Sequence, residues 1–333
     1  MKEQYKIAVI QETLTSWIEE AVVTMAWSGN KQEASRTLTL EVVKVKEKTE
    51  FSIGSSIIIY DADDKELMRY IITKKDKTRN NNTIKYMARD IRWWLTRSTM
   101  DKKFENMTAS EIFISLCKML EIQIGLVTDT KVKFSVLHFV KKTPWDIIIT
   151  ALTETRKRSG KRFIVHVKNG KLELIEKATQ TMQWVIEEGK NLLDASYSES
   201  IESTYTQVQV VGKDAKGKEI SIVKKDVAAQ KQYGVMQEYI SQSDKVTQAE
   251  VNAIAVQKLK ELSILQKSGS IKAIGINGVE TGIGIYVIDH ETGLVGSFYV
   301  ESDSHQYKNG YHEMSLTLAW TDELPKIEYE ETK

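Results

Sequence analysis

The sequence predicts a β-rich α+β protein in which two β-barrel domains flank a smaller α+β domain. Short segments of alternating polar and apolar residues occur near both ends, as in strands with one buried face. The middle carries two helix-start signals and one hairpin signal. The length of 333 residues fits about two or three domains at roughly 150 residues each. We expect domains at 1–96, 97–195 and 196–333, the last with a helical insertion at about 227–265.

The first domain is predicted from period-two alternation. Within 37–42, Leu38, Leu40 and Val42 fall on one side of a strand and polar residues on the other. Polar turn clusters separate further expected strands at 21–27, 53–60, 67–73 and 83–88. About five or six short strands at this spacing indicate a small barrel or sandwich.

The middle domain begins with two expected helices. Residues 108–111, Thr-Ala-Ser-Glu, form a capping box, and Gly125 offers a place for that helix to stop. The second helix is expected to have Thr143 as its N-cap and Pro144 at its first position, and to end at Gly160. The dipeptide Asn-Gly at 169–170 then predicts a type I′ hairpin, because both residues tolerate positive φ.

The last domain returns to alternation but is interrupted. Strands are expected at 204–211, 219–223, 270–274, 284–288, 294–300 and 314–320. Between them, a capping box at 247–250 opens a helix that runs to about Leu262. The apolar face of such an insertion needs a cover, so we expect it to contact neighbouring chains. Two β-domains of similar size also raise the possibility of a duplicated module.

Composition excludes several classes of protein. Lys and Arg number 47 against 46 Asp and Glu, and this net charge of +1 gives no field that attracts nucleic acid or an anionic membrane. Charges interrupt every apolar stretch before the ~18 residues of a membrane span, so we expect a soluble chain without signal peptide or membrane insertion. The single cysteine, Cys117, forms no intramolecular disulfide, fits synthesis in a reducing cytoplasm, and is expected in a helix core.

No metal, cofactor or catalytic pattern is complete. His290 and His312 each begin like H-E-x-x-H, but the residue four positions later is apolar, so the zinc-binding pair is missing. His305 and His312 are the best remaining metal candidates, and we interpret them as polar loop histidines. The glycine-rich run 275–284 lacks the P-loop ending and the strand-to-helix order of a dinucleotide site, which favours turns between strands. No G-x-S-x-G motif occurs.

Three other clusters leave alternatives open. Two carboxylate pairs suit a glycoside hydrolase, although 46 acidic residues produce such pairs by chance: Glu187 with Glu188, and Glu199 with Glu202. The densest basic cluster suits a phosphate grip, a helix C-terminus or a subunit contact: Arg156, Lys157, Arg158, Lys161 and Arg162. The tryptophans suit a glycan platform or core and interface positions: Trp27, Trp93, Trp94, Trp145 and Trp320. The adjacent pair 93–94 cannot face one core, so one ring is expected to meet another domain or subunit.

Several stretches, in order, resemble one family. They are WSGN at 27–30, SRTL at 35–38, FSIG at 51–54, YMARD at 86–90, WL at 94–95, FENMTASEI at 104–112, SGKRF at 159–163, YG at 233–234, LVGSFYV at 294–300 and GYHEM at 310–314. With this spacing the chain resembles the tail hub (baseplate hub) proteins of contractile-tailed phages, defective prophages and phage-tail-like bacteriocins, in the XkdQ-like group. No single motif is specific; their order and spacing together carry the resemblance.

The resemblance implies a structural, non-enzymatic hub of a contractile injection system. Such hubs are homotrimers with two β-barrels per chain that look like the tube subunit. Three chains thus offer six barrels to the six-fold tail tube and three-fold symmetry to the spike, beside other baseplate proteins and the tape-measure protein. Many tail hubs carry a fused lysozyme or peptidase, but here three domains use up the chain. The alternatives are a tail-associated cell-wall hydrolase and a glycan- or receptor-binding tail module.

Overall fold

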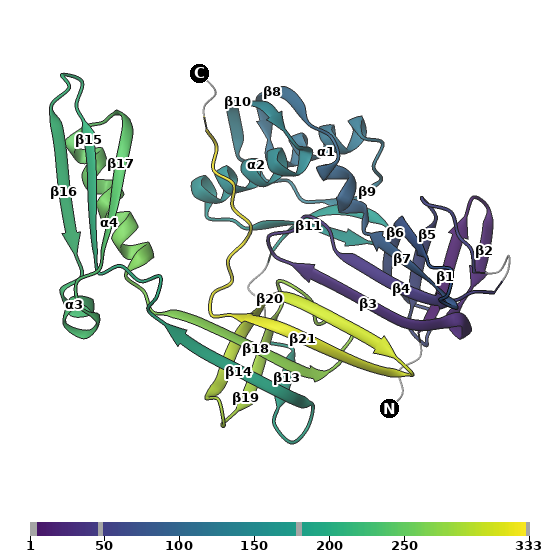
Figure 1. The fold of residues 1–333 in the computed structure, drawn as a ribbon. Helices are drawn as coiled ribbons and strands as arrows, with labels where there is room; N and C mark the ends of the chain where they lie inside the picture. The colour runs from purple at the N-terminus through teal and green to yellow at the C-terminus, as the bar shows by residue number, and fades with distance from the viewer. Residues whose placement is uncertain (1–4, 46–48, 178–181, 331–333) are drawn as a thin grey trace. The chain divides into compact units, whose positions relative to one another are not determined.

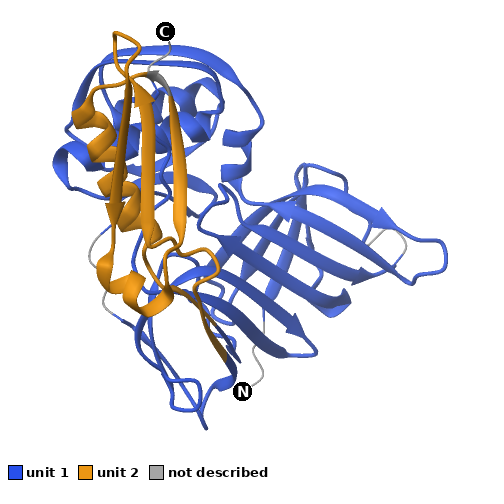
Figure 2. Ribbon diagram, turned by 60° about the vertical axis from the view of Figure 1, so that its left-hand side comes forward, with its two compact units in different colours: residues 1–195, 270–333 blue, residues 196–269 orange. Residues whose placement is uncertain are grey.

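The computed structural model describes residues 5–45, 49–177 and 182–330. The chain forms two compact units: residues 1–195 with 270–333, and residues 196–269 (Figure 2). None of the helices within the described residues has the length and apolar composition needed to cross a membrane.

One large mixed sheet dominates the first unit (Figure 1). Within the described residues its strands are β1 (Lys6–Gln11), β2 (Leu14–Trp17), β3 (Val22–Asn30), β4 (Thr37–Val43), β5 (Ser56–Tyr60), β6 (Glu66–Lys77), β7 (Thr83–Arg89), β13 (Trp184–Glu187), β14 (Leu192–Ser200), β18 (Gln266–Ile274), β19 (Gly284–Asp289), β20 (Leu294–Lys308) and β21 (Tyr311–Ala319). Its main path runs β14-β18-β21-β20-β3-β4-β7-β6-β5-β1-β2, and β13 and β19 branch from β20. Short 3₁₀ helices lie at Glu19–Ala21 (η1) and Ile91–Thr96 (η2).

Strand β20 joins the first and last parts of the chain. Its first residues pair with β19, and after a register shift between Val300 and Ser302 its last residues pair with β3, with His305 opposite Trp27. Such a bulge re-aims a strand and lets it change partners. The two expected β-domains thus share one continuous sheet, and no pairing among the described strands closes either part into a barrel.

The predicted alternation is confirmed in the N-terminal strands. Leu38, Leu40 and Val42 of β4 are fully buried, as are Tyr86 of β7 and Met25 of β3. They share one core beneath the sheet, while the intervening polar residues of β4 stay partly exposed. Burial of alternate residues fixes the register, because a shift by one residue would turn the apolar set outward.

A compact α+β part follows in the same unit. It contains β8 (Met100–Thr108), α1 (Ala109–Met119), β9 (Ile124–Val127), β10 (Lys133–Lys142), α2 (Pro144–Ser159), β11 (Phe163–Lys168) and β12 (Lys171–Glu176). Strands β8 and β10 pair antiparallel, and β11, β12 and β9 form a second small sheet. Helices α1 and α2 pack on each other and contact both sheets around one apolar core.

The predicted helix starts and the hairpin are confirmed. Thr108 and Thr143 form complete capping boxes, the second with Asp146, and α2 ends at Gly160 with φ 71°. The hairpin of β11 and β12 turns through 169–170, where φ is 49° and 69°, as a type I′ turn requires.

Helix α1 ends earlier than expected, at Met119 and not at Gly125. Glu121 adopts φ 55°, its N–H donates to Lys118 O at 3.2 Å, and Ile122 N–H donates to Cys117 O at 2.9 Å. This is a Schellman motif with glutamate in the position where glycine is usual. Burial of Ile122 beside the helix stabilises the turn.

The second unit is larger than the insertion expected at about 227–265. It holds β15 (Gln207–Lys213), β16 (Glu219–Lys225), α3 (Val227–Tyr233), β17 (Gln237–Lys245) and α4 (Gln248–Leu262). Strand β15 pairs with β16 and, in parallel, with β17, so strands expected in the last β-domain belong to this unit. Helix α4 begins at the predicted capping box and covers Val208 and Val210 through Val251 and Ala255.

Cys117 gives the first testable prediction. Its side chain is fully buried in the α+β core, and burial raises the pKa of its thiol to about 12. Because only the thiolate reacts, DTNB should label the native protein at pH 8 at least about a hundredfold more slowly than the protein in guanidinium. Equal labelling rates would contradict a closed core, and Cys117→Ala should give no labelling in either condition.

Candidate functional site

A buried ion pair joins the beginning of the chain to its end. Arg36, in the loop between β3 and β4, donates through Nη1 to Oδ1 of Asp303 on β20 at 2.9 Å, and its Nη2 donates to Oδ2. The Asp303 side chain has no exposed surface, and that of Arg36 is 13% exposed. Gly29 provides the space that the Arg36 guanidinium occupies, since a Cβ at this position would lie 2.4 Å from Arg36 Nη1. Two parallel charge-assisted hydrogen bonds fix the orientation of both groups.

Neighbouring polar groups add further hydrogen bonds to the Arg36–Asp303 ion pair, and we call this cluster the joint. Asp303 Oδ1 also accepts hydrogen bonds from the backbone N–H and the hydroxyl of Thr281, at 2.7 and 2.6 Å. Asp90 Oδ2 accepts from the backbone N–H of Arg36 at 2.9 Å, and Asp90 Oδ1 accepts from the N–H of Arg92 at the start of η2. Arg36 therefore ties together β20, the loop before β19 and η2.

These contacts decide the charge of Asp303. Burial alone would raise the pKa of its carboxyl, but the nearby His305 ring, the Arg36 guanidinium and Thr281 hold that pKa well below its usual range. His305 Nε2 lies 3.4 Å from Asp303 Oδ2 without hydrogen-bond geometry, so Arg36 and Thr281 are the effective partners. Asp303 is ionised at neutral pH.

The interpretation of His305 and His312 as loop residues is wrong. Both are buried, on β20 and β21, and His305 Nδ1 lies 2.9 Å from His312 Nε2. Trp27 stacks on His305 with ring centroids 4.9 Å apart, and Tyr5 Oη lies 3.0 Å from His312 Nδ1. Burial lowers the pKa of His305. Within the described residues no three His, Cys, Asp or Glu side chains are grouped to hold a metal ion.

The glycine run 275–284 lies between β18 and β19, as predicted. Gly278 and Gly282 have φ of 86° and 92°, values that favour glycine in turns. Gly275 allows the closest approach in this run, because a Cβ there would lie 2.0 Å from Cγ of His312. The run therefore packs against the histidine pair.

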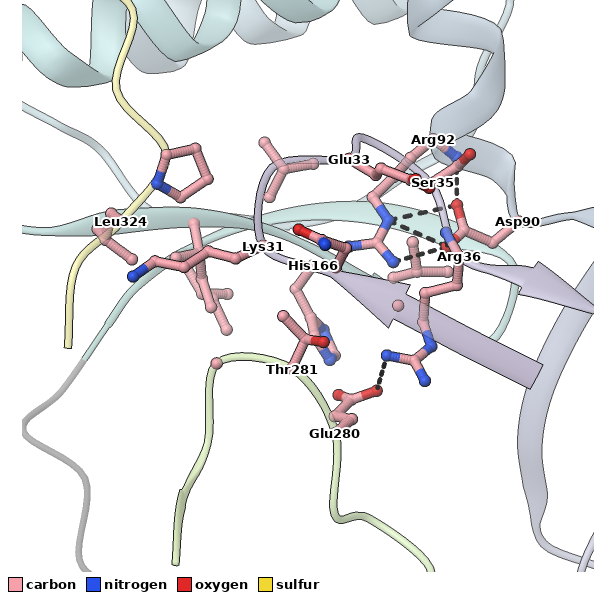
Figure 3. A pocket seen from close by; sticks show the side chains of 18 of the residues that line it. Lys31, Glu33, Ser35, Arg36, Asp90, Arg92, His166, Glu280, Thr281 and Leu324 are labelled. Carbon is pink, nitrogen blue, oxygen red and sulfur yellow. Dashed lines mark hydrogen bonds and ion pairs between the residues drawn. The ribbon is translucent and has the colours of Figure 1, made fainter. Parts of the chain in front are cut away.

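A cavity of about 410 Å³ lies beside the joint (Figure 3). Its walls come from the β3–β4 loop, β6, α2, β11, the loop 280–283 and residues 323–325. Arg92 with Asp90, and Arg36 with Glu280 at 3.6 Å, lie along one side in Figure 3. Lys31 extends on the other side toward Leu324.

Three of the candidate carboxylates contact other side chains and not one another. Glu187 binds Lys190 at 2.7 Å, and Glu188 lies 3.1 Å from His290. In the second unit, Glu199 accepts a hydrogen bond from the Tyr197 hydroxyl, and Glu202 is exposed in the turn after β14. Local partners explain the positions of Glu187, Glu188 and Glu199.

The basic cluster largely binds acidic groups of the same chain. Three of its side chains pair with acids: Lys157 with Glu154 and Glu328, Lys161 with Glu176 at 3.2 Å, and Arg162 with Asp322 at 3.0 Å. The guanidinium of Arg158 lies 4.9 Å from the centre of the Phe134 ring. The basic last turn of α2 agrees with the helix C-terminus interpretation, while Arg156 lines the cavity.

The C-terminal segment after β21 crosses to the α+β part (Figure 1). Asp322 pairs with Lys177 at 2.5 Å as well as with Arg162. Further along, the Tyr329 hydroxyl accepts from His138 N–H at 2.9 Å and its ring packs edge-on against Phe139. Sequence analysis missed this tether, although the alternation of apolar and acidic residues in Ile-Glu-Tyr-Glu at 327–330 was its signal.

The five candidate tryptophans occupy separate places. Trp27 lies in the N-terminal core, Trp145 packs against the α+β core, and Trp320 meets Phe298 of β20. Trp93 and Trp94 lie together on η2 with ring centroids 4.9 Å apart. Trp94 is 42% exposed, so its contact with another domain or subunit stays a prediction.

Comparison with known proteins identifies the family. The profile of the YQBQ-like family matches residues 25–319. The chain belongs to the YQBQ-like family. It is 26% identical over 316 residues to the phage-like element PBSX protein XkdQ of Bacillus subtilis, which covers 94% of this chain and 96% of that protein.

Solved structures share the fold of this YQBQ-like protein. The prophage MuSo2 43 kDa tail protein from Shewanella oneidensis superposes with a TM-score of 0.69 at 14% identity, over 94% of this chain and 97% of that one. A chain of the Francisella PdpA-VgrG complex gives a TM-score of 0.58 at 9% identity, over 99% of this chain and 60% of that one. The likeness extends over nearly the whole length of the chain.

The joint supplies the second prediction. In Arg36→Met the Asp303 carboxylate stays buried without its counter-charge, so the free energy of unfolding of the first unit should fall by about 3–5 kcal/mol. Urea unfolding followed by tryptophan fluorescence measures this selectively, because all seven tryptophans lie in the first unit. As control, Asp64→Asn breaks the exposed Lys6–Asp64 pair and should cost at most about 1 kcal/mol. Equal effects of the two variants would contradict the role of the joint.

Proposed function

We propose that this chain is a structural component of a phage tail or a phage-tail-like particle. The observation that carries this proposal is a fold likeness to a prophage tail protein over 94% of the chain, together with the family match over 25–319. The relative XkdQ is named as a protein of a phage-like element, in agreement with this role. The chain would be part of the assembled particle at its baseplate.

Within that particle we infer the role of a hub. Residues 1–96 supply one β-module and the strands β13, β14 and β18–β21 supply most of a second, with the α+β part from β8 to β12 between them. Three copies of a two-module chain offer six similar modules to a six-fold tube and three-fold symmetry to the spike. The likeness to a chain of a complex that contains VgrG supports a spike partner. The tail tube, baseplate and tape-measure proteins are the other partners we propose.

The proposed role is non-enzymatic and rests on extended interfaces. Large exposed apolar side chains on β2, η2 and the loop before β5 support such interfaces: Leu14, Trp17, Ile53 and Trp94. Surface ion pairs account for Glu187 and Glu188 without a catalytic role. Peptidoglycan clearance by the purified protein that is lost in Glu187→Gln or Glu188→Gln would favour the hydrolase alternative, and selective glycan-array binding would favour the receptor alternative.

The third prediction concerns the mass in solution. Light scattering should give about 114 kDa, three times the 38.0 kDa of the chain, for the protein alone, or about 114 kDa plus the mass of three spike chains for a three-to-three complex with the spike protein of the same particle. A chain that stays monomeric with spike, tube and baseplate proteins present would contradict the hub. A dimer under all conditions would contradict the three-fold symmetry.

The fourth prediction assigns contacts between copies to the second unit. Strands β14 and β18 are neighbours in the sheet, so a short Gly-Ser turn can replace residues 201–265. The first unit should keep its tryptophan-monitored unfolding transition, because its core includes none of the removed side chains. Light scattering should then show loss of the trimer. A stable trimer of the shortened chain would place those contacts in the first unit.

A further inference from the structure

We propose that the cavity beside Arg36 binds a small amphipathic anion, with a carboxylate or sulfonate head on an apolar body. This goes beyond the structural role and does not depend on it. The cavity lies within the first unit, and its volume of about 410 Å³ falls in the range of roughly 300–1,000 Å³ that is usual for small-molecule sites.

The walls of the cavity suit the apolar body of such a ligand. Helix α2 contributes Ile149 and Leu152, and β11 contributes Phe163 and Val165, all of them buried core residues. Leu324 of the C-terminal segment also lines the cavity. Contact with these side chains removes apolar ligand surface from water, which is the main source of affinity in sites of this type.

The charges that line the cavity are unevenly paired. Four cations have carboxylate partners: Arg36 with Asp303, Arg69 with Glu66, Arg92 with Asp90, and Lys177 with Asp322. Lys31 and Arg156 also line the cavity, and neither has a carboxylate of the described residues within 4.0 Å. Two of the lining acids have other cationic partners, since Glu33 pairs with Arg89 and Glu280 with Arg36. A third, Glu323, lies more than 4.0 Å from the ammonium of Lys31. The lining therefore has two cations without a close counter-ion.

Lys31 is the residue that we expect to bind the head group. Its backbone N–H donates to Glu301 O at 3.0 Å, which fixes its position just after β3. Burial lowers the pKa of its ammonium despite the more distant charges of Glu323, Glu301 and Asp322. An anion at this position would restore the stabilisation that the ammonium loses with its water. A single-charge head suits the site better than a phosphate, because most other lining cations are already neutralised.

The experiment uses the full chain and 8-anilinonaphthalene-1-sulfonate, an apolar sulfonate, as the probe, with octanoate as the competitor. Calorimetry should show one saturable site from which octanoate displaces the probe. In Lys31→Gln the affinity for the probe should fall about tenfold, the effect of losing one charge-assisted contact, and Lys31→Arg should restore most of it. The matched control is Lys85→Gln, which removes an exposed lysine on β7 outside the cavity.

Each outcome decides the proposal. Saturable binding that Lys31→Gln weakens, Lys31→Arg restores and Lys85→Gln leaves unchanged supports it. Absence of saturable binding overturns it, as does binding that Lys31→Gln and Arg156→Gln both leave unchanged or that octanoate does not compete. Unfolding followed by tryptophan fluorescence checks that each variant stays folded, and Leu152→Trp, which fills the cavity, should also reduce binding of the probe.

Discussion

The pairing of β3 with β20, fastened by Arg36 and Asp303, is the constraint on which the rest of the first unit depends. The two residues are 267 positions apart, yet their side chains form a buried bidentate ion pair. Removing either partner would leave a charge in a place without water to solvate it. The same joint brings Trp27 onto His305 and the loop 280–283 against the β3–β4 loop, so it also shapes the cavity.

Two devices connect the α+β part to this sheet. Asp90 caps η2 and accepts a hydrogen bond from Arg36, which couples the start of that part to the joint. At the other end, Asp322 pairs with Arg162 and Lys177, and the Tyr329 hydroxyl accepts a hydrogen bond from the backbone N–H of His138 on β10. The second unit has its own core around Val208 and Val251. A chain that joins firmly connected β-modules to an independently cored unit suits a protein whose task is assembly.

The separation of the candidate carboxylates from one another has a physical cause. Neighbouring positions in sequence, as in Glu187 and Glu188, place carboxylates on adjacent residues of a strand or turn, where they point to different local partners. Acid–base chemistry needs convergence of such groups in a shared cavity. The charged groups that do converge, Arg36, Asp90 and Asp303, come from distant segments and carried no local signal.

The sequence by itself determined the helix starts, the hairpin at 169–170 and the buried faces of the strands. These depend on capping, φ preference and side-chain period, which act between residues a few positions apart. Only the tertiary structure decided the β3–β20 pairing, the burial of His305 and His312, the extent of the second unit and the early end of α1 at Met119. Strand partners and buried charges depend on which edges and polar groups meet in space, and alternation is the same whichever partner a strand finds.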